Sequence, residues 1–441
     1  MTLRFGTDGV RGEALTELTP ELVHALGRAA ALTLDADRFV VGRDTRESGP
    51  VLEDALTEGM RAEGADVERL EVVPTPVVAW VAARENIAGA VLSASHNPYR
   101  DNGVKLFAPG GRKLTDDVER RLEAALDRLR DDDAPPGGGN GAMEDRSDVA
   151  GHYLEWVTST VPANALDGLR IVVDCANGAA YRLAPAALRR LGADVEVLGA
   201  DPNGTNINDR CGSTHPDRLQ ERVGEIDAAA GLAFDGDADR VLAVDEQGDV
   251  VDGDHIIALC AGDRHDRGAL PDDTVVVTVM TNLGFRLAME ERGIRVVETP
   301  VGDRHVLEAL EKGGWGLGGE QSGHIVFRDL ATTGDGLLTG IQLLDLVGRS
   351  GERLSRLASA AMTRLPQVLH NVEVAERAPD VAERLAAEIE AVEGELGETG
   401  RVLVRPSGTE PLVRVMVEAP TEEQADRAAQ RLVDAVKHLD R

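Results

Sequence analysis

Several residue types are scarce in this chain, and each scarcity excludes a class of protein. Lysine occurs only at Lys105, Lys113, Lys312 and Lys437, and aromatic residues make up 3% of the 441 residues. With 47 Lys+Arg against 78 Asp+Glu, the formal net charge is −31. Proteins that bind nucleic acids or anionic membranes usually carry basic patches, so the sequence predicts neither partner.

Cysteines and long apolar runs are scarce as well. The three cysteines, Cys175, Cys211 and Cys260, are too few and too scattered for a disulfide framework or a Cys-rich metal site, so we expect buried thiols. No run approaches the ~18 apolar residues that a membrane span needs, and the first residues lack the apolar core of a signal peptide. These features predict a cytoplasmic protein.

The excess of carboxylates with almost no lysine is typical of proteins that stay soluble in concentrated salt. A Debye length of ~3 Å at 1 M salt weakens the repulsion between so many like charges. An ordinary acidic cytosolic enzyme is the alternative. Hydrophobic residues make up 42% of the chain, which is enough for buried cores, so disorder does not explain the acidity.

Three stretches share one layout, in which a β-branched strand is followed by an amphipathic helix, a glycine turn and a second strand. They cover residues 38–76, 169–204 and 273–303. Apolar strands of this kind indicate βαβ units with a parallel sheet covered by helices on both faces. We expect Gly64, Gly192 and Gly293 to end the helices with positive φ.

The repeats predict the domain organisation. The acidic, Pro- and Gly-rich stretch at 131–141 is a linker that closes the first domain, and after Leu365-Pro366 the pattern changes to two strands with a helix after each. We therefore predict an α/β protein with three similar mixed or parallel α/β domains in series and a smaller C-terminal α+β domain. The predicted domains are residues 1–145, 146–252, 253–366 and 367–441.

The first of four polar loops contains Ser95 and His96. It follows a strand at 90–93, and Pro98 prevents a helix from forming there. Ser95 is a candidate nucleophile, although adjacent Ser and His side chains rarely face each other well enough for proton transfer, and a structural turn is the alternative. Ser93 is expected to end the strand and to point away from Ser95.

The second loop contains Asp235, Asp237 and Asp239, spaced by two. This spacing directs three carboxylates to one side, where only a cation neutralises them at low cost, and all-oxygen ligands suit Mg²⁺. An EF-hand loop is the rival, with Glu246 at its twelfth position. However, Arg240 stands where that loop needs glycine, and the flanking residues indicate strands. A solvated acidic turn is the remaining alternative.

The third and fourth loops carry groups that bind sugars and phosphates. Glu320, Ser322 and His324 alternate, so in an extended chain they would face one way and could hydrogen-bond the hydroxyls of a sugar; a hairpin with polar edges is the alternative. The fourth loop offers arginine forks, hydroxyls and backbone amides to an anion, through Arg405, Ser407, Gly408, Thr409 and Arg414. No GxxxxGK[ST] motif is present, which favours phosphoryl transfer on a phosphosugar without ATP.

The motifs SASHNP, DGDADR, GEQSGH and RPSGTEP, in this order, resemble the α-D-phosphohexomutases over essentially the whole chain. The segments FGTDGVRG, NINDRCGSTHPDRLQ and TTGDGLL, together with Gln321, are most similar to the branch of that family that acts on glucosamine phosphates. One departure is Ala238, where the family often has glycine and where we expect the change to be tolerated.

The resemblance implies a fold, a reaction and a cofactor. Four domains would surround a central cleft, with the C-terminal domain as a phosphate-binding lid. Glucosamine 6-phosphate and glucosamine 1-phosphate would interconvert through a phosphoserine at Ser95 and glucosamine 1,6-bisphosphate. One Mg²⁺ would be held by Asp235, Asp237, Asp239 and the phosphate on Ser95. A homodimer would suit the family, and the same chemistry on mannose or glucose phosphates is the alternative.

The resemblance also implies roles for the remaining motif residues. The substrate phosphate would bind Arg405, Ser407, Gly408, Thr409 and Arg414, and the sugar hydroxyls would bind Glu320 and Ser322. Arg11, Lys105 and Arg240 would offset charge on the transferring group. Lys105 is the first candidate and His324 the second for general acid–base catalysis, and His96 would orient the loop. A phosphatase and a non-catalytic sugar-phosphate sensor are the alternative functions of a different class.

The salt hypothesis predicts how stability responds to KCl. Screening of the excess carboxylates should raise the midpoint of thermal unfolding by several degrees between dilute buffer and about 2 M KCl. Differential scanning calorimetry measures this directly. A midpoint that is indifferent to KCl would contradict the hypothesis.

Overall fold

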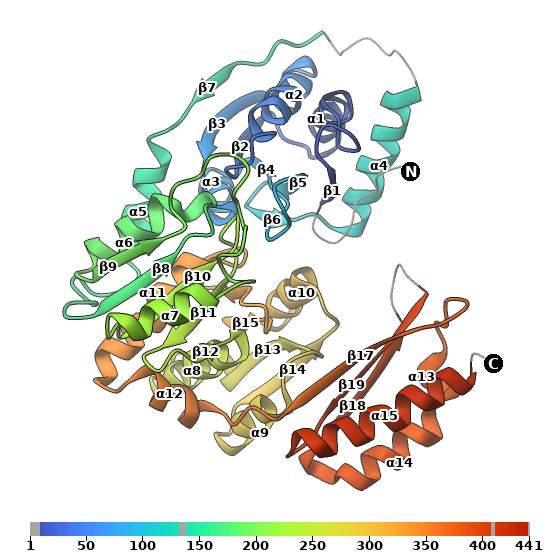
Figure 1. Ribbon diagram of the computed structural model, residues 1–441. Coiled ribbons are helices and arrows are strands. Elements are labelled where there is room, and N and C mark those ends of the chain that lie inside the picture. Colours follow the sequence, from blue (N-terminus) through green and yellow to red (C-terminus); the bar gives the residue numbers. More distant parts are fainter. Residues whose placement is uncertain (1–8, 132–137, 407–410, 440–441) are drawn as a thin grey trace. The chain divides into compact units, whose positions relative to one another are not determined.

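The computed structural model describes residues 9–131, 138–406 and 411–439. The chain divides into two compact units, Met1–Met280 with Ile294–Ser359 and Thr281–Gly293 with Ala360–Arg441. Three β-sheets belong to the first unit and a fourth sheet belongs to the second (Figure 1).

The three predicted βαβ units are present. In each of them the two strands pair in parallel and are joined by one helix. The units are β2 (Arg38–Arg43), α2 (Gly49–Ala62) and β3 (Asp66–Val72); β8 (Arg170–Asp174), α6 (Leu183–Arg190) and β9 (Asp194–Leu198); and β13 (Thr274–Thr278), α9 (Leu283–Glu291) and β14 (Arg295–Thr299). Gly64, Gly192 and Gly293 have φ of 94°, 99° and 73°, as their positions after these helices predicted.

The first three sheets are mixed, because antiparallel strands extend each parallel core. The first has the order β1-β5-β4-β2-β3-β7, with β6 paired to β5. Its further strands are β1 (Val10–Glu13), β4 (Ala88–Leu92), β5 (Asp101–Ala108), β6 (Arg112–Lys113) and β7 (Met143–Asp145). The second has the order β12-β11-β10-β8-β9 and the third β14-β13-β15-β16. Their further strands are β10 (Ala230–Phe234), β11 (Val241–Asp245), β12 (Val250–Val251), β15 (Leu317–Gly319) and β16 (Ile325–Phe327).

Helices cover the sheets of the first unit. The remaining ones are α1 (Pro20–Thr33), α3 (Thr75–Glu85), α4 (Asp116–Asp131), α5 (Val149–Thr158), α7 (Asp217–Glu225), α8 (Gly253–Asp266), α10 (Asp303–Gly313), α11 (Gly336–Ser350) and α12 (Leu354–Ala361). Helices α1 and α2 pack closely, since a Cβ at Gly27 would lie 2.2 Å from the carbonyl oxygen of Leu56. No helix in the described parts of the chain is both long and apolar enough to cross a bilayer. The three cysteines are buried and free, as expected.

The C-terminal sheet has one strand more than the sequence predicted. Residues 401–419 form two antiparallel strands, β18 (Arg401–Pro406) and β19 (Leu412–Glu418), where we expected one. The prediction merged them into one strand because it did not use the Pro and Gly residues of this stretch as turn signals. Strand β17 (Gln367–Glu373) pairs with the other edge of β19, and the helices are α13 (Val381–Arg384), α14 (Ala386–Leu396) and α15 (Glu422–Leu439). The wholly buried Glu418 accepts a hydrogen bond from the Leu283 backbone N–H at 2.9 Å, which ties β19 to α9.

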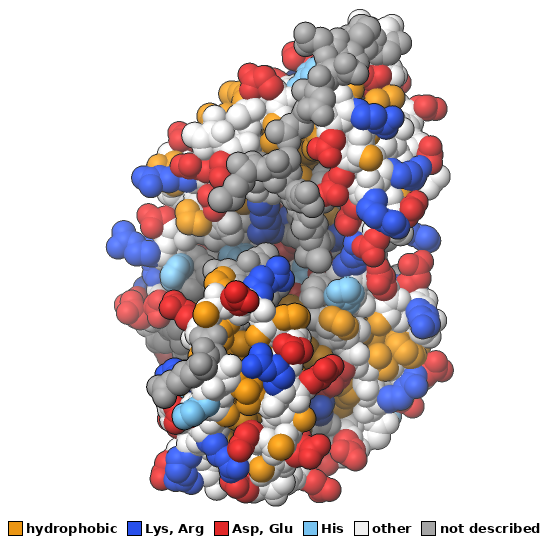
Figure 2. Space-filling view, turned by 90° about the vertical axis from the view of Figure 1, so that its right-hand side faces the viewer, with side chains coloured by type: hydrophobic (Ala, Val, Ile, Leu, Met, Phe, Trp, Pro, Cys, Tyr) orange, Lys and Arg blue, Asp and Glu red, His pale blue; other side chains and the backbone are white. Residues whose placement is uncertain are grey.

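Charged side chains of both signs cover the surface. Figure 2 shows Asp and Glu side chains spread over the face in view, with Lys and Arg side chains between them. Many arginines are paired with carboxylates, as between Arg349 and Asp263 at 3.0 Å. On this face the acidic side chains are therefore interspersed with basic ones, and ion pairs offset part of the excess negative charge.

An aromatic cluster around the buried Tyr153 connects three segments of the first unit. The rings of Trp80 on α3 and of Tyr153 and Trp156 on α5 lie 5.4–5.8 Å apart. The Tyr153 hydroxyl donates to Asp335 Oδ2 at 2.6 Å, and the other oxygen of Asp335 accepts the Leu338 N–H and caps α11. Burial raises the pKa of Asp335 to about 6.

We predict that Tyr153→Phe destabilises the first unit by about 1–3 kcal/mol, because it leaves a buried carboxylate oxygen unpaired. The folded carboxyl is ionised above its raised pKa, and the ionised form needs the donor most. The loss should therefore be larger at about pH 8 than at about pH 5. Urea unfolding at both pH values measures it.

Tyr181→Phe is the matched control. The Tyr181 hydroxyl has no hydrogen-bond partner in the portion of the chain described here, so its removal should cost little at either pH. Equal losses for the two variants would contradict the assigned role of Tyr153.

Candidate active site

Ser95 lies in a strained loop directly after β4. Its φ is +53°, in the left-handed region that residues other than glycine rarely adopt, and the residue is 1% exposed. Its backbone N–H donates to Ser93 Oγ at 2.9 Å, and Ser93 Oγ donates to Asp44 Oδ2 at 2.6 Å. Ser93 therefore supports the backbone of Ser95, a role that the strand period did not predict.

Two side chains that sequence reasoning missed hold the carbonyl groups of this loop. The buried Arg46 guanidinium donates to the carbonyl oxygens of Ser95, Asn97, Pro98 and Asp101, and to Asp44 Oδ2 at 2.8 Å. Asn208 Nδ2 donates to the carbonyl oxygens of Ser95 at 2.9 Å and Asn97 at 3.0 Å. The sequence did carry one signal for Arg46. It lies in the polar loop that follows β2, and ligands bind beyond strand ends in parallel sheets.

The structure brings Ser95 together with the three predicted aspartates. Asp235, Asp237 and Asp239 lie in the turn between β10 and β11, and one carboxylate oxygen from each lies within 4.8 Å of the others. Ser95 Oγ donates to Asp235 Oδ2 at 2.6 Å. Glu246, the twelfth position of the rival EF-hand, is bonded to Ser355 instead.

The donor set of this cluster fits a hard divalent cation. Thr75 Oγ1 and Lys105 Nζ donate to Asp237 Oδ2 at 2.6 and 2.8 Å, and Lys105 Nζ also donates to Asp239 Oδ2 at 3.1 Å. The Oδ1 atoms of Asp237 and Asp239 are buried and have no hydrogen-bond partner among the described residues. Buried carboxylate oxygens without a donor are what a Mg²⁺ ion would satisfy.

The pKa values of two of these aspartates are shifted in opposite directions. Burial, and then the charges of Asp239 and Asp237, raise the pKa of Asp235 well above its usual range. Burial also acts to raise the pKa of Asp239, but Lys105, His324 and Arg240 outweigh it and hold that pKa well below its usual range. Neighbouring carboxyls with opposite shifts are typical of sites that bind a cation or a proton.

His96 lies closer to Ser95 than the sequence led us to expect. Its Nδ1 is 3.3 Å from Ser95 Oγ, within hydrogen-bonding reach. Burial, and then the charges of Arg240 and Arg11, lower the pKa of His96. Arg11 on β1 and Arg240 after the aspartates are thus both near the loop, and His96 is a neutral partner for the hydroxyl at pH 7.

His324 is buried, and both of its ring nitrogens face protein groups. Nδ1 lies 3.8 Å from Asp239 Oδ2, and Nε2 accepts the Gly334 N–H at 3.2 Å. Burial acts to lower the pKa of His324, but the nearby carboxylate of Asp239 and the charges of Asp303 and Glu320 raise it overall. In this position His324 connects the aspartate turn (residues 235–239) to residues 332–336.

The alternation expected for the third loop is wrong, because residues 320–323 form a turn at the tip of the β15–β16 hairpin. The Gly323 N–H donates to the Glu320 carbonyl at 3.0 Å, and Gly323 has φ of +91°. Glu320 Oε1 accepts the Gly302 N–H at 3.0 Å, while Ser322 is exposed. The turn therefore gives Glu320, Ser322 and His324 different environments.

Two arginines of the predicted phosphate loop are neighbours in the second unit. Arg405 on β18 and Arg414 on β19 are register partners, and burial and then the charge of Arg414 lower the pKa of Arg405. Such a like-charge pair is relieved by an anion. Ser407, Gly408 and Thr409 lie outside the described residues.

The chain matches four family models in order. They are described as Phosphoglucomutase/phosphomannomutase alpha/beta/alpha domain I (residues 2–132), domain II (152–248) and domain III (252–365), and the C-terminal domain (369–435). Together they confirm the predicted four-domain architecture and the family resemblance.

Three known proteins illustrate the similarity. The phosphoglucosamine mutase of Salinispora arenicola is 53% identical over 443 residues, covering 98% of each chain. The crystal structure of a phosphoglucomutase/phosphomannomutase family protein from Burkholderia thailandensis has a TM-score of 0.82 and 26% identity, covering 98% of this chain and 97% of that one. The Aspergillus fumigatus N-acetylphosphoglucosamine mutase, solved with GlcNAc-6P and magnesium, has a TM-score of 0.73 and 21% identity, covering 100% and 96%. This chain therefore belongs to the phosphoglucomutase/phosphomannomutase family.

Proposed function

We propose that this chain is an isomerase that interconverts glucosamine 6-phosphate and glucosamine 1-phosphate. The full-length similarity to a phosphoglucosamine mutase, at 53% identity, supports the choice of sugar. The contact of 2.6 Å between Ser95 Oγ and Asp235, inside a cluster of buried carboxylates, is the structural observation that carries the proposal.

In the proposed reaction Ser95 is a phosphoserine. Its phosphoryl group passes to the free 1-hydroxyl of glucosamine 6-phosphate, which gives glucosamine 1,6-bisphosphate. The bisphosphate turns round and returns its 6-phosphate to Ser95, so that glucosamine 1-phosphate leaves and the enzyme is again phosphorylated. Atoms and charge balance without ATP.

The buried carboxylates would hold the cofactor. Asp235, Asp237 and Asp239, with the phosphate on Ser95, would bind one Mg²⁺, and the fungal neighbour solved with magnesium supports this assignment. When bound, Mg²⁺ withdraws negative charge from the phosphoryl oxygens. Lys105 fixes two of the carboxylates through its bonds to Asp237 and Asp239.

The remaining motif residues would bind the substrate and move protons. Arg405 and Arg414, with Ser407, Gly408 and Thr409, would bind the phosphate that is not being transferred, and Glu320 and Ser322 would bind the sugar hydroxyls. Arg11 and Arg240 would offset charge on the transferring group. Lys105 and His324 are the proposed acid–base residues. A cytoplasmic homodimer is the form we propose.

The direct test is a coupled assay of glucosamine 1-phosphate formation in molar KCl, with and without Mg²⁺. Wild-type protein primed with a sugar bisphosphate should turn over with Mg²⁺, lose activity in EDTA and regain it on adding Mg²⁺. Ser95→Ala should lower kcat by at least about 1,000-fold, because the phosphoryl carrier is gone. Ser359→Ala, at an exposed serine of α12, is the matched control and should keep full activity.

Two outcomes of this assay would contradict the proposal. A higher kcat/KM for mannose 6-phosphate or glucose 6-phosphate would assign the same chemistry to another sugar. Stoichiometric release of inorganic phosphate that ignores added bisphosphate would make the protein a phosphatase.

The buried lysine gives a second prediction. Lys105 is 3% exposed and bonds two of the proposed metal ligands, so Lys105→Met should lower kcat by about 100-fold or more while the fold is kept. Lys312→Met removes an exposed lysine and should leave kcat unchanged. Steady-state kinetics measure kcat, and circular dichroism checks that the fold is kept. A near-normal kcat for Lys105→Met would refute the catalytic role of Lys105.

A further inference from the structure

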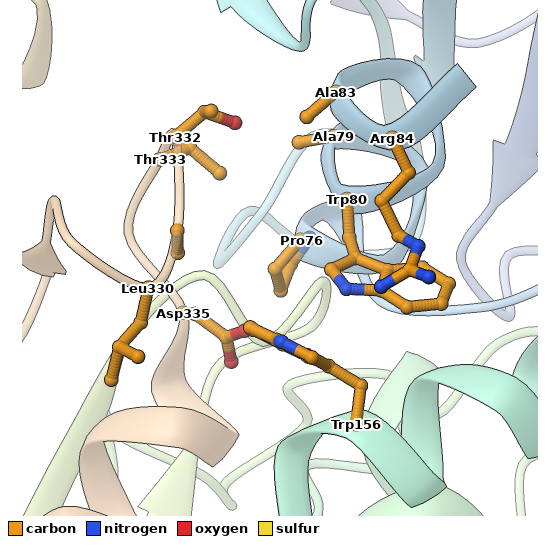
Figure 3. Close-up of a pocket in the computed structure, with 11 residues that line it drawn as sticks. Pro76, Ala79, Trp80, Ala83, Arg84, Trp156, Leu330, Thr332, Thr333 and Asp335 are labelled. Atoms are coloured by element: carbon orange, nitrogen blue, oxygen red, sulfur yellow. The ribbon is translucent and has the colours of Figure 1, made fainter. Parts of the chain in front are cut away.

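A cavity of about 180 Å³ lies in the first unit, outside the residues assigned to catalysis. Helix α3 lines one side with Trp80 and two alanines, Ala79 and Ala83, and α5 contributes Trp156. The loop that contains Thr332 lines the opposite side. Figure 3 shows the two indoles and the Thr332–Thr333 segment facing one another across this space.

The walls of the cavity favour a flat aromatic group. The rings of Trp80 and Trp156 pack against each other, 5.7 Å apart and tilted by 40°, and both residues line the cavity, which therefore has an aromatic wall. The small side chains of Ala79 and Ala83 leave room beside it. An apolar cavity of ~150 Å³ accommodates benzene, so this cavity has the volume for one aromatic ring.

Two polar groups at the cavity lack an ion-pair or hydrogen-bond partner among the described residues. The exposed Arg84 guanidinium lies 4.8 Å over the Trp80 ring and has no ion pair with any described residue, although the chain has 78 acidic residues. Thr332 Oγ1 is buried and has no hydrogen-bond partner within the described ranges. The cavity thus combines an aromatic wall, a cation without a carboxylate partner and an unpaired hydroxyl, while the Asp335 carboxylate that also lines it is already bonded to Tyr153 and Leu338. This combination suits a ring whose carboxylate lies on Arg84.

The loop on the far side of the cavity continues into the candidate active site. The Gly334 N–H donates to His324 Nε2 at 3.2 Å, and the Gly336 N–H donates to the Ala238 carbonyl at 3.0 Å, inside the aspartate turn. A Cβ at Gly336 would lie 2.5 Å from the Arg240 carbonyl oxygen, so the two backbone segments are closely packed there. A molecule that displaces Thr332 would therefore shift the aspartate turn and His324.

We propose that this cavity is a regulatory site for small aromatic carboxylates, with the ring against Trp80 and Trp156 and the carboxylate on Arg84. Its occupancy changes turnover through residues 332–336. The binding part stands independently of the catalytic assignment, whereas the effect on turnover rests on the proposed function.

The test uses benzoate as the probe on the full-length protein. Two of the three tryptophans line the cavity, so benzoate should give a saturable change in tryptophan fluorescence, and saturation-transfer NMR should detect the bound ring. Benzyl alcohol, which keeps the ring and lacks the carboxylate, should bind at least about tenfold more weakly. No saturable response to benzoate would overturn the proposal.

Variants locate the site. Ala83→Leu should abolish binding by filling the cavity, and Arg84→Gln should weaken it by at least about tenfold while leaving the cavity open. Arg295→Gln is the matched control, since that guanidinium lies 5.0 Å over the Trp315 ring away from the cavity, and binding should be unchanged. Benzoate binding that survives both cavity variants would overturn the assignment.

Turnover is measured separately with and without benzoate. Saturating benzoate should change kcat in the wild type and leave kcat of Arg84→Gln unaltered. Saturable binding with unchanged kcat would overturn the coupling through residues 332–336. Failure of the catalytic proposal would instead appear as absent activity with benzoate binding intact.

Discussion

The buried charge of Asp235, Asp237 and Asp239 is the constraint on which the rest of the structure depends. Three carboxylates within 4.8 Å of one another are stable in a buried site only if cations and donors surround them. The first domain supplies these from separate elements, with Thr75 from the start of α3 and Lys105 from β5. The site is therefore assembled between domains, and the chain has kept a lysine there although it uses arginine almost everywhere else.

Backbone strain accompanies this charge. Ser95 and Ala238 both have left-handed φ, +53° and +57°, which costs on the order of 1 kcal/mol or more for each non-glycine residue. Ala238 stands where the family resemblance led us to expect glycine, and the alanine is accommodated at that cost. Arg46 and Asn208 hold the Ser95 loop in place through its carbonyl oxygens, so the strain is maintained by buried hydrogen bonds.

Periodic and local features could be predicted from the sequence, and tertiary contacts could not. The βαβ units follow from strand patterning, the positive φ of Gly64 from helix-end chemistry, and the aspartate cluster from spacing. The reversal between β18 and β19 was missed because both strands are apolar and the turn signals between them were assigned to a ligand loop. The contacts of Arg46 with the Ser95 loop join residues about fifty positions apart, and a single sequence carries no signal for such pairs.

The central claim is that Ser95 carries the phosphoryl group beside a metal site, and peptide mass spectrometry tests it most directly. Protein incubated with glucose 1,6-bisphosphate and Mg²⁺ should carry one phosphate on the peptide that contains Ser95. When glucosamine 6-phosphate is added, that phosphate should leave Ser95 and appear in the sugar bisphosphate. A Ser95 peptide that stays unphosphorylated, or a phosphate that is found on another residue, would contradict the account.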